Sequence, residues 1–151
     1  MRIALYQPEI AGNVGAILRT AACFGVPVDI IEPCGFAFAE RSLKRAAMDY
    51  VDQAEIRRHA DWEAYQAANS NAGRLVLLTT SGAQPLPGFT FRADDRFLFG
   101  NESSGVPPHI HAAADARVVI PLRSGFRSLN VSVAAGIALA EALRQTKGFA
   151  Q

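Results

Sequence analysis

Residues 120–145 constrain the fold of this chain more than any other segment. A short strand runs into a glycine-containing basic loop and then into a helix opened by Ser128 and Asn130. The helix is apolar almost all the way round until Glu141. A surface helix needs only one apolar stripe, so we expect this one to be buried on several sides. Gly136 in its middle favours close packing, and the loop's free backbone amides suit a polar cofactor, a subunit contact or both.

Strands and helices alternate along the whole chain. Apolar runs predict strands at 2–6, 28–31, 51–57, 75–79, 97–99 and 118–120. Helical spacing and capping residues predict helices from Asn13 to the stop at Gly25 and Pro27, at 40–47, at 61–68 and at 107–112, with 81–95 as a loop. This alternation predicts an α/β domain with a largely parallel sheet and helices on both faces.

The composition fits one domain that spans residues 1–151 and is half hydrophobic. The net charge of +1 gives no general sign of nucleic-acid binding, although a local basic patch remains compatible with it. No apolar run approaches the roughly 20 residues of a membrane span, and the first residues are typical of a strand. Cys23 and Cys34 form no metal or disulfide pattern, so we expect two buried thiols in a reducing cytoplasm.

Three loops follow predicted strands and carry the polar residues expected of a binding site. They are 79–82, 100–107 and 122–130, the last with Arg123 and Arg127 beside a helix N-terminus that favours anionic groups. Each also has an ordinary structural interpretation as a strand-to-helix connection. None contains the glycine pattern of a dinucleotide fold or a phosphate-loop lysine. Because ligands bind at the carboxyl ends of parallel strands, the three loops together favour a shared pocket for an adenosine-type group.

Several single residues leave two interpretations open. Asn13 is either a helix cap or a site residue, and Arg19 is either a surface salt-bridge partner or a functional charge among apolar neighbours. His109 and His111 flank one residue of a short helix and point apart, so we expect no metal site. His59 is expected on the surface.

Three motifs resemble those of the SPOUT class of RNA methyltransferases, in its ribose 2′-O-methylating branch. They are NVGAILRTA at 13–21, FLFGNESSGVP at 97–107, and IPL at 120–122 followed by SLNVSVA at 128–134. Their order and separation cover essentially the whole chain. Further segments, LYQPEI at 5–10, IEPCGF at 31–36 and KRAAMDY at 44–50, are similar to the tRNA (cytidine(34)-2′-O)-methyltransferase group.

The resemblance implies S-adenosylmethionine as methyl donor, S-adenosylhomocysteine as product, no metal, a homodimer and a C-terminal trefoil knot. It also implies the anticodon stem-loop of leucine tRNAs as substrate, with the wobble nucleotide 34, C or a modified U, as target. The knot does not follow from the residues themselves, because connection rules favour an unknotted doubly wound sheet.

The resemblance also assigns roles to individual residues. The cofactor-contacting positions of the family match Leu78, Gly100, Ile120, Ser128 and Leu129. The catalytic arginine matches Arg19, and the polar positions grouped around it match Asn13, Glu102, Ser128 and Asn130. Two departures bear on the RNA target: Asn101 stands where the wobble enzymes often have proline, and Ala140 where some carry tyrosine.

A ribose 2′-hydroxyl is a poor nucleophile unless its proton is removed or its developing charge is stabilised. Arginine keeps its charge at neutral pH, so using it as a general base would consume several kcal/mol of barrier. We therefore favour a charged Arg19 that stabilises the developing alkoxide and positions a phosphate. RNA contacts are expected at Arg123, Arg127, Lys44 and Arg45, although a solvated helix face is the simpler interpretation of the last two.

Other functions remain open from the sequence. The chain could methylate another tRNA position or ribosomal RNA. It could instead be a cofactor-binding or RNA-binding module without catalysis. The presence of all five matching residues argues against this: Asn13, Arg19, Glu102, Ser128 and Asn130. A flavodoxin-like nucleotide protein is the third alternative.

Overall fold

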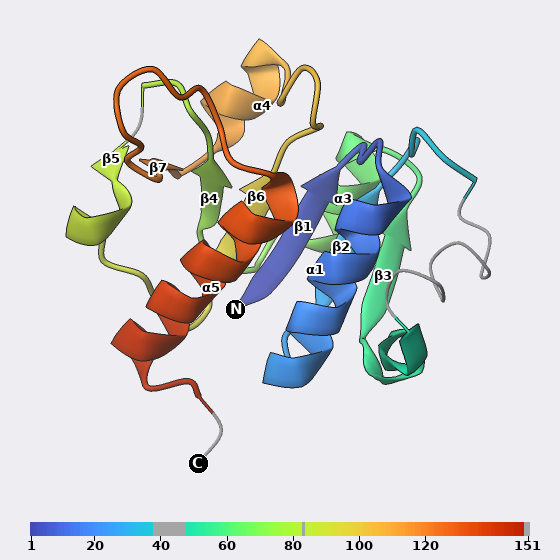
Figure 1. Cartoon of the computed structure of the whole chain (residues 1–151). Helices are drawn as coiled ribbons and strands as arrows, with labels where there is room; N and C mark the ends of the chain where they lie inside the picture. Colours follow the sequence, from blue (N-terminus) through green and yellow to red (C-terminus); the bar gives the residue numbers. More distant parts are fainter. Residues whose placement is uncertain (38–47, 83, 150–151) are drawn as a thin grey trace.

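A computed structural model describes residues 1–37, 48–82 and 84–149. Its strands are β1 (Arg2–Tyr6), β2 (Val28–Ile31), β3 (Ile56–His59), β4 (Leu75–Leu78), β5 (Gln84–Pro85), β6 (Arg96–Phe99) and β7 (Ala116–Val119). Its helices are α1 (Ala11–Phe24), α3 (Trp62–Ala68), α4 (Pro108–Ala113) and α5 (Val131–Thr146), with 3-10 turns η1 (Met48–Gln53) and η2 (Leu86–Gly88). Figure 1 shows their arrangement.

The described strands form one seven-stranded sheet in the order β3-β2-β1-β6-β4-β7-β5. Every pairing in it is parallel, which confirms the predicted α/β class. In this order β6, β4 and β7 are neighbours, so the three predicted ligand loops leave adjacent strand ends. The trefoil knot stays a prediction.

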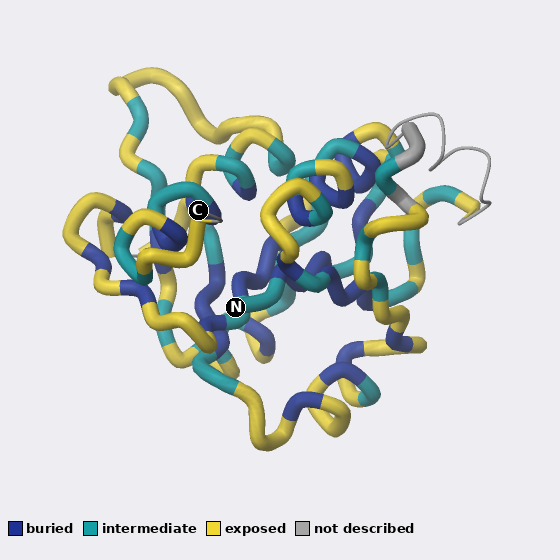
Figure 2. Tube along the Cα trace, turned by 90° about the horizontal axis from the view of Figure 1, so that it is seen from below, coloured by how far each residue is buried: buried dark blue, intermediate teal, exposed yellow. Residues whose placement is uncertain are grey.

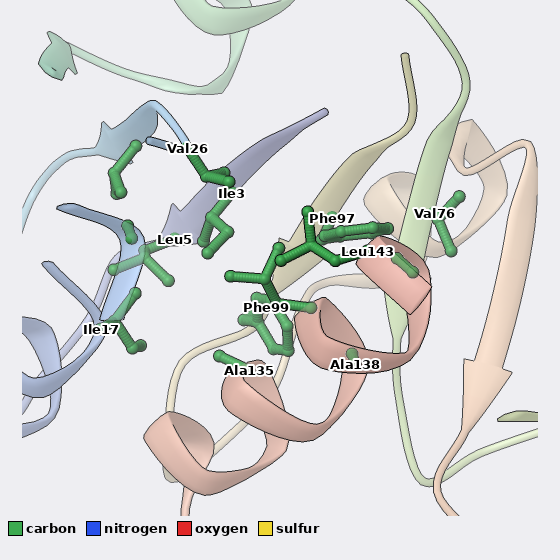
Figure 3. Close-up of a cluster of buried hydrophobic side chains, with 14 of the residues drawn as sticks. Ile3, Leu5, Ile17, Val26, Val76, Phe97, Phe99, Ala135, Ala138 and Leu143 are labelled. Carbon is green, nitrogen blue, oxygen red and sulfur yellow. The ribbon is translucent and has the colours of Figure 1, made fainter. Parts of the chain in front are cut away.

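Helices cover both faces of the sheet and bury a separate core on each. Helices α1 and α5 lie side by side on one face, while α3 and α4 lie on the other (Figure 1). Strand residues alternate between the two cores, as in β6, where Phe97 and Phe99 join the α1–α5 core and Leu98 joins the α3–α4 core. Burying each such side chain contributes about 1.5–3 kcal/mol. Figure 3 shows Phe97 and Phe99 packing beside Ala135 and Ala138 of α5, and Figure 2 shows buried residues running through the centre.

The N-cap of α1 lies three residues earlier than predicted. Asn13 lies inside the helix, and the N-cap position is Ile10, whose side chain makes no capping hydrogen bond. The prediction of Asn13 as a cap is therefore wrong, because its side-chain amide is instead bonded to Glu102 and Asn130, two side chains from distant segments. The predicted stop at Gly25 is confirmed: this residue has φ 64°, the left-handed conformation that suits glycine, and closes the helix on Ala21 and Ala22.

Helix α5 differs from its prediction in burial. Asn130 caps it through its side chain, as predicted. The expectation that it is buried on several sides is wrong for the single chain, because Val133 and Ile137 are 50% and 39% exposed. A Cβ added to Gly136 would meet no atom within 4 Å. One chain supplies cover for only one side of this helix, and an apolar stripe is left facing outward.

Other local predictions need correction. The strand predicted at 51–57 begins only at Ile56, as β3, because residues 48–53 form the 3-10 turn η1. The predicted loop at 81–95 contains the short strand β5 and the turn η2. His59 is buried and bonded to Asp29 at 2.7 Å, because β3 lies beside β2. Cys23 is exposed and Cys34 is half-buried, against the expectation of two buried thiols. The predicted basic helix at 40–47 lies outside the described residues. None of the helices described is long and apolar enough to cross a membrane.

Candidate active site

A cavity of about 640 Å³ opens at the carboxyl ends of β4, β6 and β7. Its walls are the three predicted loops and the first turn of α5. In Figure 1 the loop from β7 to α5 (orange-red) arches over this end of the sheet. The volume lies within the range of about 300–1,000 Å³ typical of small-molecule and cofactor sites.

All five residues predicted for cofactor contact line this cavity. They are Leu78, Gly100, Ile120, Ser128 and Leu129. Leu78 and Ile120 come from or follow neighbouring strands, and Ser128 and Leu129 immediately precede α5. Residues to which the resemblance gave no role also line it, among them His111, Leu122 and Val131. The cavity thus combines apolar side chains with exposed loop backbone.

Gly100 allows two stretches of backbone to touch at the cavity wall. A Cβ built on Gly100 would lie 2.6 Å from the carbonyl carbon of Gly105. The contact is closed by paired backbone hydrogen bonds between Asn101 and Gly105, at 3.0 and 2.9 Å. Any side chain at position 100 would therefore push the loop apart.

Asn101 and Glu9, which sequence reasoning did not assign, hold this loop. The side-chain oxygen of Asn101 accepts hydrogen bonds from the backbone N–H groups of Ser103 and Ser104, both at 3.0 Å. Its amide donates to the Gln7 carbonyl at 3.2 Å. Glu9 accepts from the Ser103 hydroxyl at 2.9 Å. Only the spatial approach of segments more than 90 residues apart reveals this contact, and the sequence carries no signal for it.

Glu102 binds the segment that leads into α1. Its carboxylate accepts hydrogen bonds from the backbone N–H of Glu9 at 2.8 Å and of Ile10 at 3.2 Å. It also accepts from the Asn13 side-chain amide at 3.0 Å. A negative charge at a helix N-terminus is favourable, because it satisfies free N–H groups and complements the helix dipole. Glu102 therefore ties the loop after β6 to the start of α1.

Asn13 and Asn130 continue this contact into a polar string. The Asn130 amide donates to the Asn13 side-chain oxygen at 2.9 Å, and the Asn130 oxygen accepts from the Ser132 backbone at 2.9 Å. Asn13 is largely buried, and both ends of its amide are bonded. The string Glu102–Asn13–Asn130 brings three of the four predicted catalytic residues to the cavity wall.

Arg19, the fourth predicted catalytic residue, is not brought there. It lies on the exposed side of α1, and its guanidinium carbon is 5.1 Å from the centre of the Tyr50 ring. It follows Asn13 by six residues, which is about 9 Å along a helix axis. Arg19 is not among the described residues that line the cavity of its own chain.

The predicted RNA-contacting residues fall into two groups. Arg127 lines the cavity, and Arg123 is exposed on the same loop without lining it. Lys44 and Arg45 lie outside the described residues. In the part of the chain that the structure describes, no group of three or more His, Cys, Asp or Glu residues is placed to hold a metal ion.

Together, a parallel α/β sheet and a cavity of this size at its carboxyl edge define an α/β protein with a small-molecule or cofactor site at its strand ends. Residues 1–140 match the model of the SpoU rRNA Methylase family. The chain therefore belongs to this family.

Three similar proteins illustrate the relationship. The tRNA (cytidine(34)-2′-O)-methyltransferase of Beijerinckia indica is 54% identical over 150 residues, which cover 99% of this chain and 94% of that protein. A solved structure from work on the 2-OH methylation of C/U34 on tRNA is 39% identical to this chain, with a TM-score of 0.92. The match covers 97% of this chain and 96% of that one. An AdoMet-bound rRNA methyltransferase from Sinorhizobium meliloti is 28% identical, with TM-score 0.86, and this match covers 95% of this chain and 55% of that one.

Proposed function

We propose that this chain, a single domain of residues 1–151, methylates the 2′-hydroxyl of the wobble nucleotide, C or a modified U, in leucine tRNAs in the cytoplasm. The observation that carries the proposal is the 640 Å³ cavity with the Glu102–Asn13–Asn130 string along its wall. The names of the Beijerinckia relative and of the structure at TM-score 0.92 support the same target nucleotide.

The cavity residues fit S-adenosylmethionine, which supplies an electrophilic methyl group when bound. Leu78, Ile120 and Leu129 offer apolar surface for a flat adenine ring, and the close backbone contact at Gly100 leaves no side chain in its way. Ser128 and the backbone of its loop offer polar groups for the ribose and the amino-acid end. The AdoMet-bound relative from Sinorhizobium supports this choice.

A homodimer explains two features of the single chain. The outward stripe of α5 around Val133 and Ile137, with open space above Gly136, suits close packing against a second helix. Arg19 does not line its own cavity, so its catalytic role requires a shift of α1 or a second subunit. The exposed stripe on the neighbouring helix supports the second subunit, and we assign Arg19 to the cavity of the partner subunit.

In this arrangement Arg19 stabilises the negative charge that develops on the ribose 2′-oxygen while the hydroxyl proton passes to solvent water. A guanidinium also binds a phosphate through two parallel hydrogen bonds, which fixes the ribose relative to the cavity. Asn13 and Glu102 hold the start of α1, the helix that carries Arg19, against the loop after β6. They act by positioning, because their polar atoms are already bonded within the chain.

The test is methyl transfer from labelled S-adenosylmethionine to unmodified and cell-derived leucine tRNAs, followed by identification of the labelled nucleoside. A 2′-O-methylated nucleotide at position 34 is the expected product. Transfer to another tRNA position or to ribosomal RNA would keep the reaction and replace the substrate. Cofactor binding without transfer to any RNA would leave a binding module instead of an enzyme.

A further inference from the structure

Phe126 is the most exposed large hydrophobic residue described in this chain, with 72% of its surface accessible. It lies on the loop between β7 and α5, and among the described residues its ring pairs with no other aromatic ring. Such a ring faces water at a cost in free energy unless binding covers it.

The loop presents Phe126 through a tight turn. The Phe126 N–H donates to the Arg123 carbonyl at 3.3 Å, and Gly125 between them has φ 94°. A positive φ at the third position of a turn is the type II geometry, which glycine adopts without strain. The turn makes 123–126 the tip of an otherwise exposed loop, which Figure 1 shows arching over the carboxyl end of the sheet.

This tip lies directly beside the cavity. Arg127, Ser128 and Leu129 line the cavity wall, and Leu122 lines it on the other side of the turn. Consecutive Cα atoms are about 3.8 Å apart, so the Phe126 backbone stands at the rim. The nucleobase of a nucleotide whose ribose enters this cavity must come to rest close to its mouth.

The charged residues near Phe126 distinguish its surroundings from the apolar stripe of α5. Phe126 has Arg123 and Arg127 on either side within three residues, whereas residues 131–140 contain no charged side chain. An uncharged apolar stripe suits another protein surface. An aromatic ring between two guanidinium groups suits a nucleobase flanked by phosphates, because bases stack on aromatic side chains and arginine neutralises the backbone.

We propose that Phe126 is a base-stacking residue, with Arg123 and Arg127 binding the adjacent phosphates, and that it holds a nucleobase of the single-stranded RNA loop at the mouth of the cofactor cavity. The inference rests on the proposed RNA methylation and adds a residue that sets RNA affinity. Single-stranded loops are the usual targets of such stacking, since their bases can be splayed out.

The decisive variant is Phe126→Leu, which keeps an apolar side chain and removes the ring. We expect the KM for tRNA to rise about tenfold, in line with the loss of one base–aromatic stack. The kcat at saturating tRNA and the Kd for S-adenosylmethionine should stay within about twofold of the parent protein, because the ring is placed outside the cofactor cavity. Phe126→Trp should keep the KM for tRNA close to that of the parent, since it retains a stacking surface.

The matched control is Phe149→Leu. Phe149 is also an exposed phenylalanine, but it packs edge-on against Phe24 near the C-terminus of the chain. We expect it to leave the KM for tRNA unchanged. A spectroscopic readout separates stacking from other contacts: 2-aminopurine placed at or next to the target nucleotide should lose fluorescence on binding the parent protein, and should lose less on binding Phe126→Leu.

Three results would overturn the inference. An unchanged KM and unchanged 2-aminopurine quenching in Phe126→Leu would show that no base stacks there. A weaker dimer in sedimentation measurements would assign Phe126 to a protein interface. A higher Kd for S-adenosylmethionine in Phe126→Leu would place Phe126 in the wall of the cofactor cavity. Failure of the proposed function is distinguishable from these, because the parent protein would then methylate no tRNA in the same assay.

Discussion

Hydrogen-bonded polar residues gather at both ends of the parallel sheet, but they serve different purposes at the two ends. At the amino ends, Asp95 is fully buried and accepts hydrogen bonds from Arg74 at 2.9 and 2.8 Å and from the Arg92 backbone at 2.8 Å. The Asp95 carboxylate holds the pKa of Arg74 above its usual value. Asp115 likewise accepts from the Leu75 N–H at 2.7 Å. These polar groups bond to one another and to the backbone, and they fix the positions at which the strands begin.

At the carboxyl ends, polar groups also bond one another, but around an open space. Glu102, Asn13 and Asn130 form a string along the wall of a 640 Å³ cavity. Substitutions at the amino ends should therefore change stability and spare catalysis, and those at the carboxyl ends and on α1 should do the reverse. The following predictions test this contrast in order of decreasing effect.

The largest effect is expected for Arg19→Lys. Lysine keeps the positive charge but loses the planar fork that binds an oxyanion and a phosphate together. We expect kcat to fall by about 100-fold or more, the usual loss when one transition-state hydrogen-bond donor is removed. Thermal unfolding should be unchanged, because Arg19 is exposed. Steady-state kinetics with Arg57→Lys, another exposed arginine, provide the control; near-parental turnover by Arg19→Lys would remove Arg19 from the mechanism.

Asp95→Asn should affect stability at the opposite end of the sheet. Removing one partner of a fully buried ion pair costs about 3–5 kcal/mol, and the loss here should lie at or below the lower end of that range, because the Arg74 side chain is 23% exposed and keeps part of its hydration. We expect this loss in the free energy of unfolding measured by urea titration, with kcat unchanged at temperatures where the variant is folded. A large fall in kcat with little loss of stability would contradict the division between the two ends.

Gly100→Ala should weaken cofactor binding. The new Cβ would meet the Gly105 backbone, and such overpacking shifts backbone, here the loop at the cavity wall. We expect the Kd for S-adenosylmethionine to rise about tenfold, as measured by calorimetry. Gly12→Ala is the matched control, because a Cβ there meets no atom within 4 Å. Equal affinities of the two variants would mean that the 100–105 loop does not shape the cofactor site.

The smallest effect is expected in the alkylation rates of the two thiols, Cys23 and Cys34. Partial burial, together with the negative charge of Glu32, raises the pKa of Cys34 to about 11. At pH 8 only about a thousandth of Cys34 is thiolate, the reactive form. We expect iodoacetamide to modify the exposed Cys23 first and the rate at Cys34 to rise about tenfold per pH unit between pH 7 and 9, measured by peptide mass spectrometry. A rate at Cys34 that is independent of pH would contradict the assigned burial.

The sequence predicted what depends on local pattern. The continuous apolar run at 75–79 and the strand at 2–6 appear as β4 and β1, and the helix stop at Gly25 follows from a conformation that glycine adopts easily. The motifs also identified the loops that line the cavity. Asn13, by contrast, is a good capping residue by type, but it lies inside the helix, where its side-chain amide donates to Glu102, 89 residues away.

Residue types and spacing by themselves determined the α/β class and the positions of most strands and helices, because these depend on periodicity. The residues predicted for cofactor contact came from the resemblance of short motifs, and the structure places all five at the cavity wall. Tertiary structure alone decided which groups meet: Glu102 at the start of α1, Glu9 on Ser103, His59 on Asp29, and Arg19 away from its own cavity. Such contacts join segments far apart in the chain. Their partners are fixed by strand order and helix packing, which no local pattern encodes.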